Sequence, residues 1–291
     1  TNLSIRLDAD IALSEEAWTP IAKFGGSFDG DGHTVSGMTI GTSAQPSERT
    51  SAGFFETLAN GASVSNLKLT DVSVNVARTG SSLDDAVYAG GLVGGGQTMG
   101  ADVRIDNCSV TGGTISASSG MHVYAGGLAA RLGGTHHVTN RYADIDITAA
   151  SSKYVASAGG LVGTFGSSSF VGNCAALGAV AACGNSQEYN RVRAGGLLAS
   201  APFLTENCYA SGNVTLTNAS SDYDAYAGTL IGEQSGSAVV DSHYSSKAVL
   251  TVNGESKDLI AVGKTPSSWY SGINYNKITA QDDVTNDAFA A

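Results

Sequence analysis

A short segment that recurs along the chain constrains the fold more than any other feature of the sequence. One copy is Tyr88-Ala-Gly-Gly-Leu-Val-Gly94, and its alanine returns at positions 52, 89, 125, 158, 194 and 227, so that successive copies lie 33 to 37 residues apart. A fixed period in this range is typical of repeat proteins, in which each repeat packs on the next. The sequence therefore predicts one elongated domain of stacked repeats.

Each period contains three short segments with the pattern of strands. The Ala-Gly-Gly-Leu segment comes first, a segment with a polar residue near its end follows, and a β-branched run such as Val72–Val76 completes the period. Alternation of apolar and polar residues over short runs, with glycine between them, indicates strands and not helices. We therefore predict an all-β fold, a right-handed parallel β-helix of about six rungs with three strands per rung.

Two sets of residues recur in register and are predicted to support this structure. The polar positions of the second segment are Asn66, Asn107, Asn140, Asn173, Asn207 and Asp241. Since equivalent residues of stacked rungs lie roughly 4.8 Å apart, we expect a ladder of side chains that satisfies its own buried donors and acceptors. The glycine pairs begin at Gly90, Gly126, Gly159, Gly195 and Gly228. They are expected where the backbone bends or approaches another strand closely.

The repeat divides the chain into three parts of one structural domain. Residues 1–50, which contain a turn at Asp29–Gly32, are predicted to cap the first rung, residues 51–252 to form the repeats, and residues 253–291 to form a C-terminal cap and tail. Trp269, Tyr270, Tyr275 and Ile278 are expected to pack in that second cap. The chain starts without a signal peptide, so we expect a monomeric segment of a longer protein.

Composition excludes several classes of partner. The net charge is −11 and the isoelectric point about 4.7, whereas nucleic acids and anionic lipids require clustered cations. No apolar run approaches the length of about 18 residues that a membrane-spanning helix needs. We therefore expect no nucleic acid, no membrane insertion and no cofactor.

The residues quoted above resemble those of GLUG-motif proteins. The resemblance covers roughly residues 18–250, from Phe24–Ile40 through the Ala-Gly-Gly-Leu copies. It implies a secreted or surface-exposed bacterial β-solenoid, because the family occurs in adhesin-like chains and outside the catalytic domain of some streptococcal IgA-specific metallopeptidases. The family offers no catalytic residues to transfer. The chain departs from the pattern at Phe54, Phe55, Thr229 and at Arg141, where other rungs have cysteine.

Three functions are compatible with this reading. The first is a non-enzymatic extracellular module that displays ligand-binding loops or acts as a rigid stalk, with a host or matrix protein or a glycan as partner. The second is a carbohydrate-active β-helix, a polysaccharide lyase or hydrolase, which would need clustered carboxylates with a basic residue. The third is an accessory region of a larger secreted peptidase. The arginines show no common register with the aspartates, which favours the first.

The cysteines and histidines, which could bind metals or react as nucleophiles, can also be explained by structural roles. Cys108, Cys174 and Cys208 follow the polar column and suit small core positions, although a Cys174–Cys208 disulfide is also compatible with their spacing. Cys183 has no such partner. The four cysteines contain no C-x-x-C pair, and His136 and His137 would point to opposite faces of a strand, so we predict no metal site.

Variable loops before the Ala-Gly strands are the predicted binding edge. These loops stack above one another if the rungs are in register, and they bring tyrosines close to carboxylates, a combination suited to sugars or peptides. The candidate residues are Asp84, Asp85, Tyr88, Tyr124, Asp222, Tyr223, Asp224 and Tyr226. There are two alternatives to a binding role. The tyrosines could only cover the ends of the rungs, and the aspartates could only be solvated surface charges.

Overall fold

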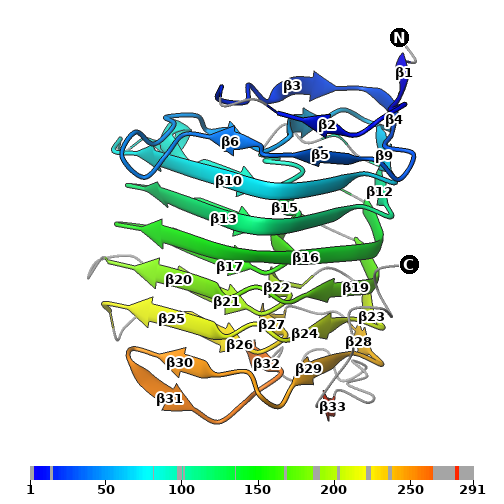
Figure 1. Ribbon diagram of the computed structural model, residues 1–291. Coiled ribbons are helices and arrows are strands. Elements are labelled where there is room, and N and C mark those ends of the chain that lie inside the picture. The colour runs from blue at the N-terminus through cyan, green and yellow to red at the C-terminus, as the bar shows by residue number, and fades with distance from the viewer. Residues whose placement is uncertain are drawn as a thin grey trace.

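The computed structural model shows a β-solenoid whose strands stack in parallel from one rung to the next (Figure 1). It describes residues 3–13, 16–80, 82–96, 100, 102–134, 136–166, 169–185, 191–201, 204–220, 224–234, 238–264 and 279–281. About six turns of parallel strands confirm the predicted all-β fold class. Within these residues the only helix is the 3₁₀ turn η1 (Leu83–Asp85), and no helix is long and apolar enough to cross a membrane.

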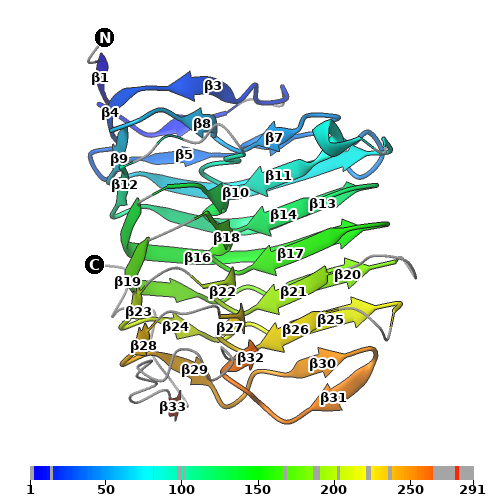
Figure 2. The same cartoon turned by 180° about the vertical axis from the view of Figure 1, so that it is seen from behind.

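One large sheet and two narrower sheets form the walls of the solenoid (Figures 1 and 2). The large sheet comprises β1 (Leu3–Arg6), β2 (Ile11–Ala12), β4 (Gly26–Asp29), β5 (Thr34–Ser36), β6 (Thr39–Ile40), β9 (Ser63–Ser65), β10 (Lys68–Arg78), β12 (Val103–Asp106), β13 (Ser109–Ser119), β16 (His136–Ser151), β19 (Phe170–Ala176), β20 (Val180–Gly184), β23 (Leu204–Glu206), β24 (Tyr209–Ala210), β25 (Val214–Asn218), β28 (Ala238–Val240), β29 (His243–Ser245), β30 (Leu250–Val252), β31 (Glu255–Lys257) and β33 (Thr279–Gln281).

The Ala-Gly copies build the second sheet, and the residues after them build the third. The second sheet comprises β7 (Ser51–Ala52), β11 (Val87–Gly90), β14 (Val123–Gly126), β17 (Val155–Gly159), β21 (Arg191–Gly195) and β26 (Ala225–Gly228). The third comprises β15 (Ala129–Leu132), β18 (Val162–Phe165), β22 (Leu198–Ser200), β27 (Ile231–Glu233) and β32 (Val262–Lys264), and β3 (Ile21–Phe24) pairs with β8 (Phe55–Leu58).

The rung differs from the sequence prediction in two ways. The Ala-Gly-Gly-Leu segment is a corner between two sheets and not one strand: β14 ends at Gly126 and β15 begins at Ala129. A Cβ on Gly126 would lie 2.2 Å from the Ala129 carbonyl oxygen, and the corresponding glycines of the other rungs face the same clash. Glycine is therefore required here because the chain turns back on its own backbone.

The second difference concerns the two remaining segments of each period. They lie in the same sheet, and in one rung both belong to the single strand β16, which contains the polar residue Asn140. All six polar residues have positive φ, between 44° at Asp241 and 58° at Asn140. Asparagine and aspartate tolerate this left-handed conformation better than other non-glycine residues. The column therefore marks a bend in the large sheet.

The interior is one continuous apolar core. Leu128, Leu161 and the alanines of the repeat point into it and are buried. At the N-terminal end, Trp18 stacks on Phe54 with ring centroids 4.9 Å apart. Phe28 packs edge-on against Phe24 and Phe55. Residues 1–50 thus close the first rung with strands of their own, since β4 pairs in parallel with β9 and β5 with β10.

The C-terminal end closes differently. Strand β31 turns back antiparallel on β30, while β32 extends the third sheet. The aromatic residues expected to pack in this cap, Trp269, Tyr270 and Tyr275, lie outside the described residues.

Candidate ligand-binding groove

The polar column lies on the outer surface of the large sheet. Asn107, Asn140, Asn173 and Asn207 are exposed, so the ladder is not buried as the sequence analysis expected. The residue after each of these asparagines is buried, whereas the asparagine itself faces solvent at the left-handed bend. Three of the four Nδ2 atoms donate along the column: Asn207 to Asn173 Oδ1 at 2.7 Å, Asn173 to Asn140 Oδ1 at 3.3 Å, and Asn107 to Asn66 Oδ1 at 2.9 Å.

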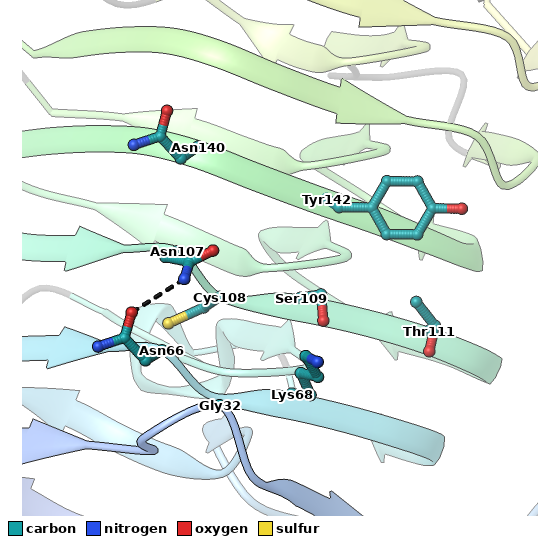
Figure 3. Close-up of a pocket in the computed structure, with 9 residues that line it drawn as sticks. All are labelled: Gly32, Asn66, Lys68, Asn107, Cys108, Ser109, Thr111, Asn140 and Tyr142. Atoms are coloured by element: carbon teal, nitrogen blue, oxygen red, sulfur yellow. Dashed lines mark hydrogen bonds between the residues drawn. The ribbon is translucent and has the colours of Figure 1, made fainter. Parts of the chain in front are cut away.

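The ladder is interrupted at one step. Asn140 Nδ2 donates to Asp106 Oδ1 at 3.1 Å and not to Asn107, and Thr139 Oγ1 donates to the same carboxylate oxygen at 2.8 Å. Among the described residues, nothing donates a hydrogen bond to Asn107 Oδ1. The break therefore leaves an amide acceptor open to solvent in the middle of the column (Figure 3).

A groove of about 250 Å³ opens beside this break. Strand register places Lys68, Ser109 and Tyr142 in one outward column, next to the asparagines. The short serine between two long side chains leaves a hollow, which Figure 3 shows with the tyrosine ring at one side and the lysine at the other. The lining residues are Gly32, Asn66, Lys68, Asn107, Cys108, Ser109, Thr111, Asn140 and Tyr142.

Polar residue types line the groove and include one cation, although the surface that they present there is mostly apolar. Lys68 is exposed and has no ion-pair partner within the described part of the chain. Burial, together with the nearby Asp144 carboxylate, raises the pKa of Tyr142 to about 12, so its hydroxyl stays protonated at neutral pH and donates to Asp144 at 3.3 Å. A second hollow, lined by Arg104, Asp106 and His137 among others, lies on the other side of Asn140. Amides, hydroxyls and a lysine together suit a ligand rich in hydroxyl groups.

The predicted tyrosine edge exists, but it is a packed surface. The rings of Tyr88 and Tyr124 stack 5.3 Å apart with 8° between their planes, and the stack continues through His122 to Tyr154. Tyr88 is buried against Ala86 and Ala130, whereas Tyr124 is half-buried. Register places Tyr226 in the same column, after Ser157 and Arg193.

The acidic members of that edge behave differently from one another. Asp84 is exposed, and Asp224 forms an exposed ion pair with Arg191 at 3.0 Å. Asp85 lies against Arg78 at 2.8 Å and accepts the Ser82 amide, and these bonds lower the pKa of Asp85. Asp222 and Tyr223 lie outside the described residues. The structure therefore shows a stack of rings here, and the Asp85 carboxylate is occupied by bonds to Arg78 and to the Ser82 amide.

Several groove residues have no counterpart among the sequence candidates. Lys68, Thr111 and Tyr142 belong to three different rungs, and only the register brings them together. The sequence could have indicated part of this groove, because Lys68, Ser109 and Tyr142 each lie two positions after a column asparagine. Within the described chain, no group of three or more histidine, cysteine, aspartate or glutamate side chains is placed to hold a metal ion.

Comparison with known proteins supports the fold and leaves the family open. No family model matches the chain. A region of halomucin from Haloquadratum walsbyi is 31% identical over 190 residues, which is 62% of this chain and 2% of that protein. A crystal structure from Bacteroides ovatus, provisionally described as an immunoglobulin A1 protease, has the same fold with a TM-score of 0.63. The sequences are 22% identical, and the match covers 97% of this chain and 78% of the other.

Proposed function

We propose that this chain is a non-enzymatic, extracellular solenoid module that binds a glycan in the groove beside Asn107. The observation that carries the proposal is the break in the amide ladder, which leaves an acceptor next to Lys68, Ser109 and Tyr142. Sugar hydroxyls donate and accept hydrogen bonds, and the groove offers both kinds of partner with an aromatic ring at its side.

The chemistry of the groove suits binding better than catalysis. Amides and aliphatic hydroxyls do not ionise near neutral pH, and the pKa of Tyr142 is raised to about 12. The carboxylates close to the column are already hydrogen-bonded. Asp106 accepts from Asn140 and Thr139. Asp29 accepts from Asn66, and Asp144 accepts from Tyr142. This arrangement holds a ligand and offers no pair of titrating groups to attack it.

An extracellular setting is supported by three observations. Only 14% of the residues are charged, and serine, threonine, asparagine and glycine fill the polar positions. The sequence resembles GLUG-motif proteins. The two similar proteins have names that refer to a mucin and to a protease of immunoglobulin A1, both of which are molecules found outside cells. We infer that the module attaches its parent protein to glycan-bearing surfaces.

Two matched pairs of variants test the groove. An array of neutral and acidic glycans first identifies a ligand, and titration calorimetry then compares Lys68→Met and Tyr142→Ala with Lys153→Met and Tyr154→Ala on the tyrosine edge. The groove variants should each lose about tenfold or more in affinity, because each removes a direct contact worth about 1.5 kcal/mol or more. Affinity lost only in the edge variants would move the site to that edge, and absence of any glycan ligand would reject the proposal.

A further inference from the structure

Three of the four cysteines lie in one inward-facing column of the large sheet. The strand registers align Cys108, Arg141, Cys174 and Cys208 on four successive rungs. All four side chains are buried, with exposed fractions of 3%, 0%, 0% and 1%. Arg141 therefore separates Cys108 from the other two, and Cys174 and Cys208 are direct neighbours.

Both cysteines are free thiols in this structure, and their spacing on adjacent strands is compatible with a disulfide. Adjacent parallel strands lie about 4.8 Å apart, and the Cα atoms of disulfide-bonded cysteines are usually about 4.4–6.8 Å apart. Cys174 Sγ lies 3.1 Å from the Gly172 carbonyl oxygen, and Cys208 Sγ lies 3.1 Å from that of Glu206, so both side chains turn the same way. Cys208 Sγ also lies 3.8 Å from the Val171 oxygen, on the rung of Cys174.

The charges around the pair distinguish the two sulfurs. Arg141 is fully buried, and its guanidinium nitrogens donate no hydrogen bond to any residue that the structure describes. The Asp106 carboxylate is 4.0 Å away. Burial alone would raise the pKa of Cys174, but the Cys208 thiol and the Arg141 charge offset it, and the pKa is lowered. Burial and the neighbouring Cys174 raise the pKa of Cys208 well above its usual value. Cys174 is thus the more nucleophilic of the two.

We propose that Cys174 and Cys208 form a cross-rung disulfide when the protein folds in an oxidising environment. The Cys174 thiolate attacks a small-molecule disulfide, one thiol leaves, and a mixed disulfide forms. Cys208 then loses its proton, and its sulfur displaces the second thiol. The two cysteines lose two electrons and two protons, and the small-molecule disulfide is reduced to two thiols.

The remaining cysteines serve as internal controls. Cys108 is two rungs from Cys174, beyond disulfide range, and Cys183 has Ala150 and Thr217 as its neighbours on the adjacent rungs. Because Cys174 and Cys208 are buried, oxidation must occur while the rungs assemble, and the bond is then protected. We therefore expect one disulfide and two free thiols in the folded chain.

Alkylation and mass spectrometry test this expectation. The reduced, unfolded chain is refolded with reduced and oxidised glutathione, its β-sheet content is checked by circular dichroism, and it is alkylated with iodoacetamide in denaturant without reductant. Two cysteines should be modified, and digestion should yield one linked peptide that joins Cys174 to Cys208. Prior treatment with reductant in denaturant should raise the count to four, whereas reductant alone should leave it at two.

Single substitutions separate this pairing from the alternatives. Cys174→Ser and Cys208→Ser should each leave all three remaining thiols free, whereas Cys108→Ala should retain the linked peptide. The proposal is overturned if the folded wild-type chain is alkylated at all four positions, or if the linked peptide contains Cys108 or Cys183. Both outcomes are read on the wild-type chain and do not depend on whether any variant folds.

Discussion

At the scale of single residues, asparagine has two tasks in this protein. Its backbone adopts the left-handed conformation at the bend of the large sheet, with φ of 53° at Asn173, and its amide bonds the asparagines on both neighbouring rungs. Glycine could perform the first task and most polar residues the second. Asparagine performs both at one position, which explains why it recurs at this bend.

Substitution of Asn173 should separate these two contributions. Asn173→Ala loses both the left-handed preference and the ladder bonds, and should cost about 1–3 kcal/mol of unfolding free energy. Asn173→Gly keeps the preference and should cost less. Urea denaturation followed by circular dichroism measures both. Equal losses in the two variants would show that backbone conformation contributes nothing here.

Arg141 occupies a core position without any hydrogen bond to its guanidinium. Burial lowers its pKa, the direction expected for a cation removed from water. Replacing a buried charge with an apolar side chain of similar volume is often neutral or stabilising, by about 1–4 kcal/mol. Arg141→Met should therefore unfold at the same or a higher urea concentration than the wild type. Exposed Arg104→Met is the control, expected within about 0.5 kcal/mol. A marked loss of stability in Arg141→Met would reveal a partner for the guanidinium.

At the scale of elements, the rung is shaped by its Ala-Gly-Gly-Leu corner. The alanine is small enough to face the narrow interior, the first glycine allows the backbone to approach a carbonyl oxygen, and the leucine fills the core beyond the turn. These needs are local, and they explain why the segment recurs so closely while the outer loops vary. The corner joins the second sheet to the third in the rungs of β14, β17, β21 and β26.

Truncation of a corner leucine should be costly. Leu161 is fully buried, and Leu161→Ala should lower the free energy of unfolding by about 2–5 kcal/mol, because it leaves a cavity between two rungs. Val249→Ala removes apolar atoms from a side chain that is 46% exposed and should cost less than about 0.5 kcal/mol. Denaturant titration measures the loss of unfolding free energy in both variants. Similar losses would show that Leu161 is not packed in the interior.

At the scale of the whole molecule, each rung contacts only its neighbours, so stability builds up along the axis and the ends require protection. Residues 1–50 provide it at one end, where Trp18 and Phe24 cover Phe54 and Phe55. Strands β3, β4 and β5 also pair with the edges of β8, β9 and β10. Without them, the first rung would present unpaired parallel strands and an apolar core to solvent.

Deletion of residues 1–50 should therefore cause association and not a simple loss of one rung. Exposed strand edges pair with other chains, and Phe55 and Leu58, fully buried in the whole chain, would lose their cover. Light scattering and size-exclusion chromatography of the 51–291 fragment, beside the full chain at equal concentration, measure this. A soluble monomeric fragment with an unchanged β-sheet spectrum would contradict the capping role.

The repeat in the sequence by itself determined three features: the parallel β-solenoid, the column of asparagines and the need for glycine at one corner. These features follow from short-range geometry, since a residue repeated once per rung must stack on its equivalents. The sequence did not reveal that Ala-Gly-Gly-Leu spans two sheets or that the asparagines lie on the outer surface. The alternation of apolar and polar residues does not indicate where a strand bends.

Only the tertiary structure decided where ligands can bind. The groove depends on Lys68, Ser109 and Tyr142 lying side by side on three rungs and on a ladder bond that goes to Asp106 instead of Asn107. Neither can be predicted from any one segment, since both depend on contacts between side chains of different rungs. The predicted tyrosine edge shows the converse: sequence spacing brought Tyr88 and Tyr124 together, but packing against Ala130 decided that one of the rings is buried.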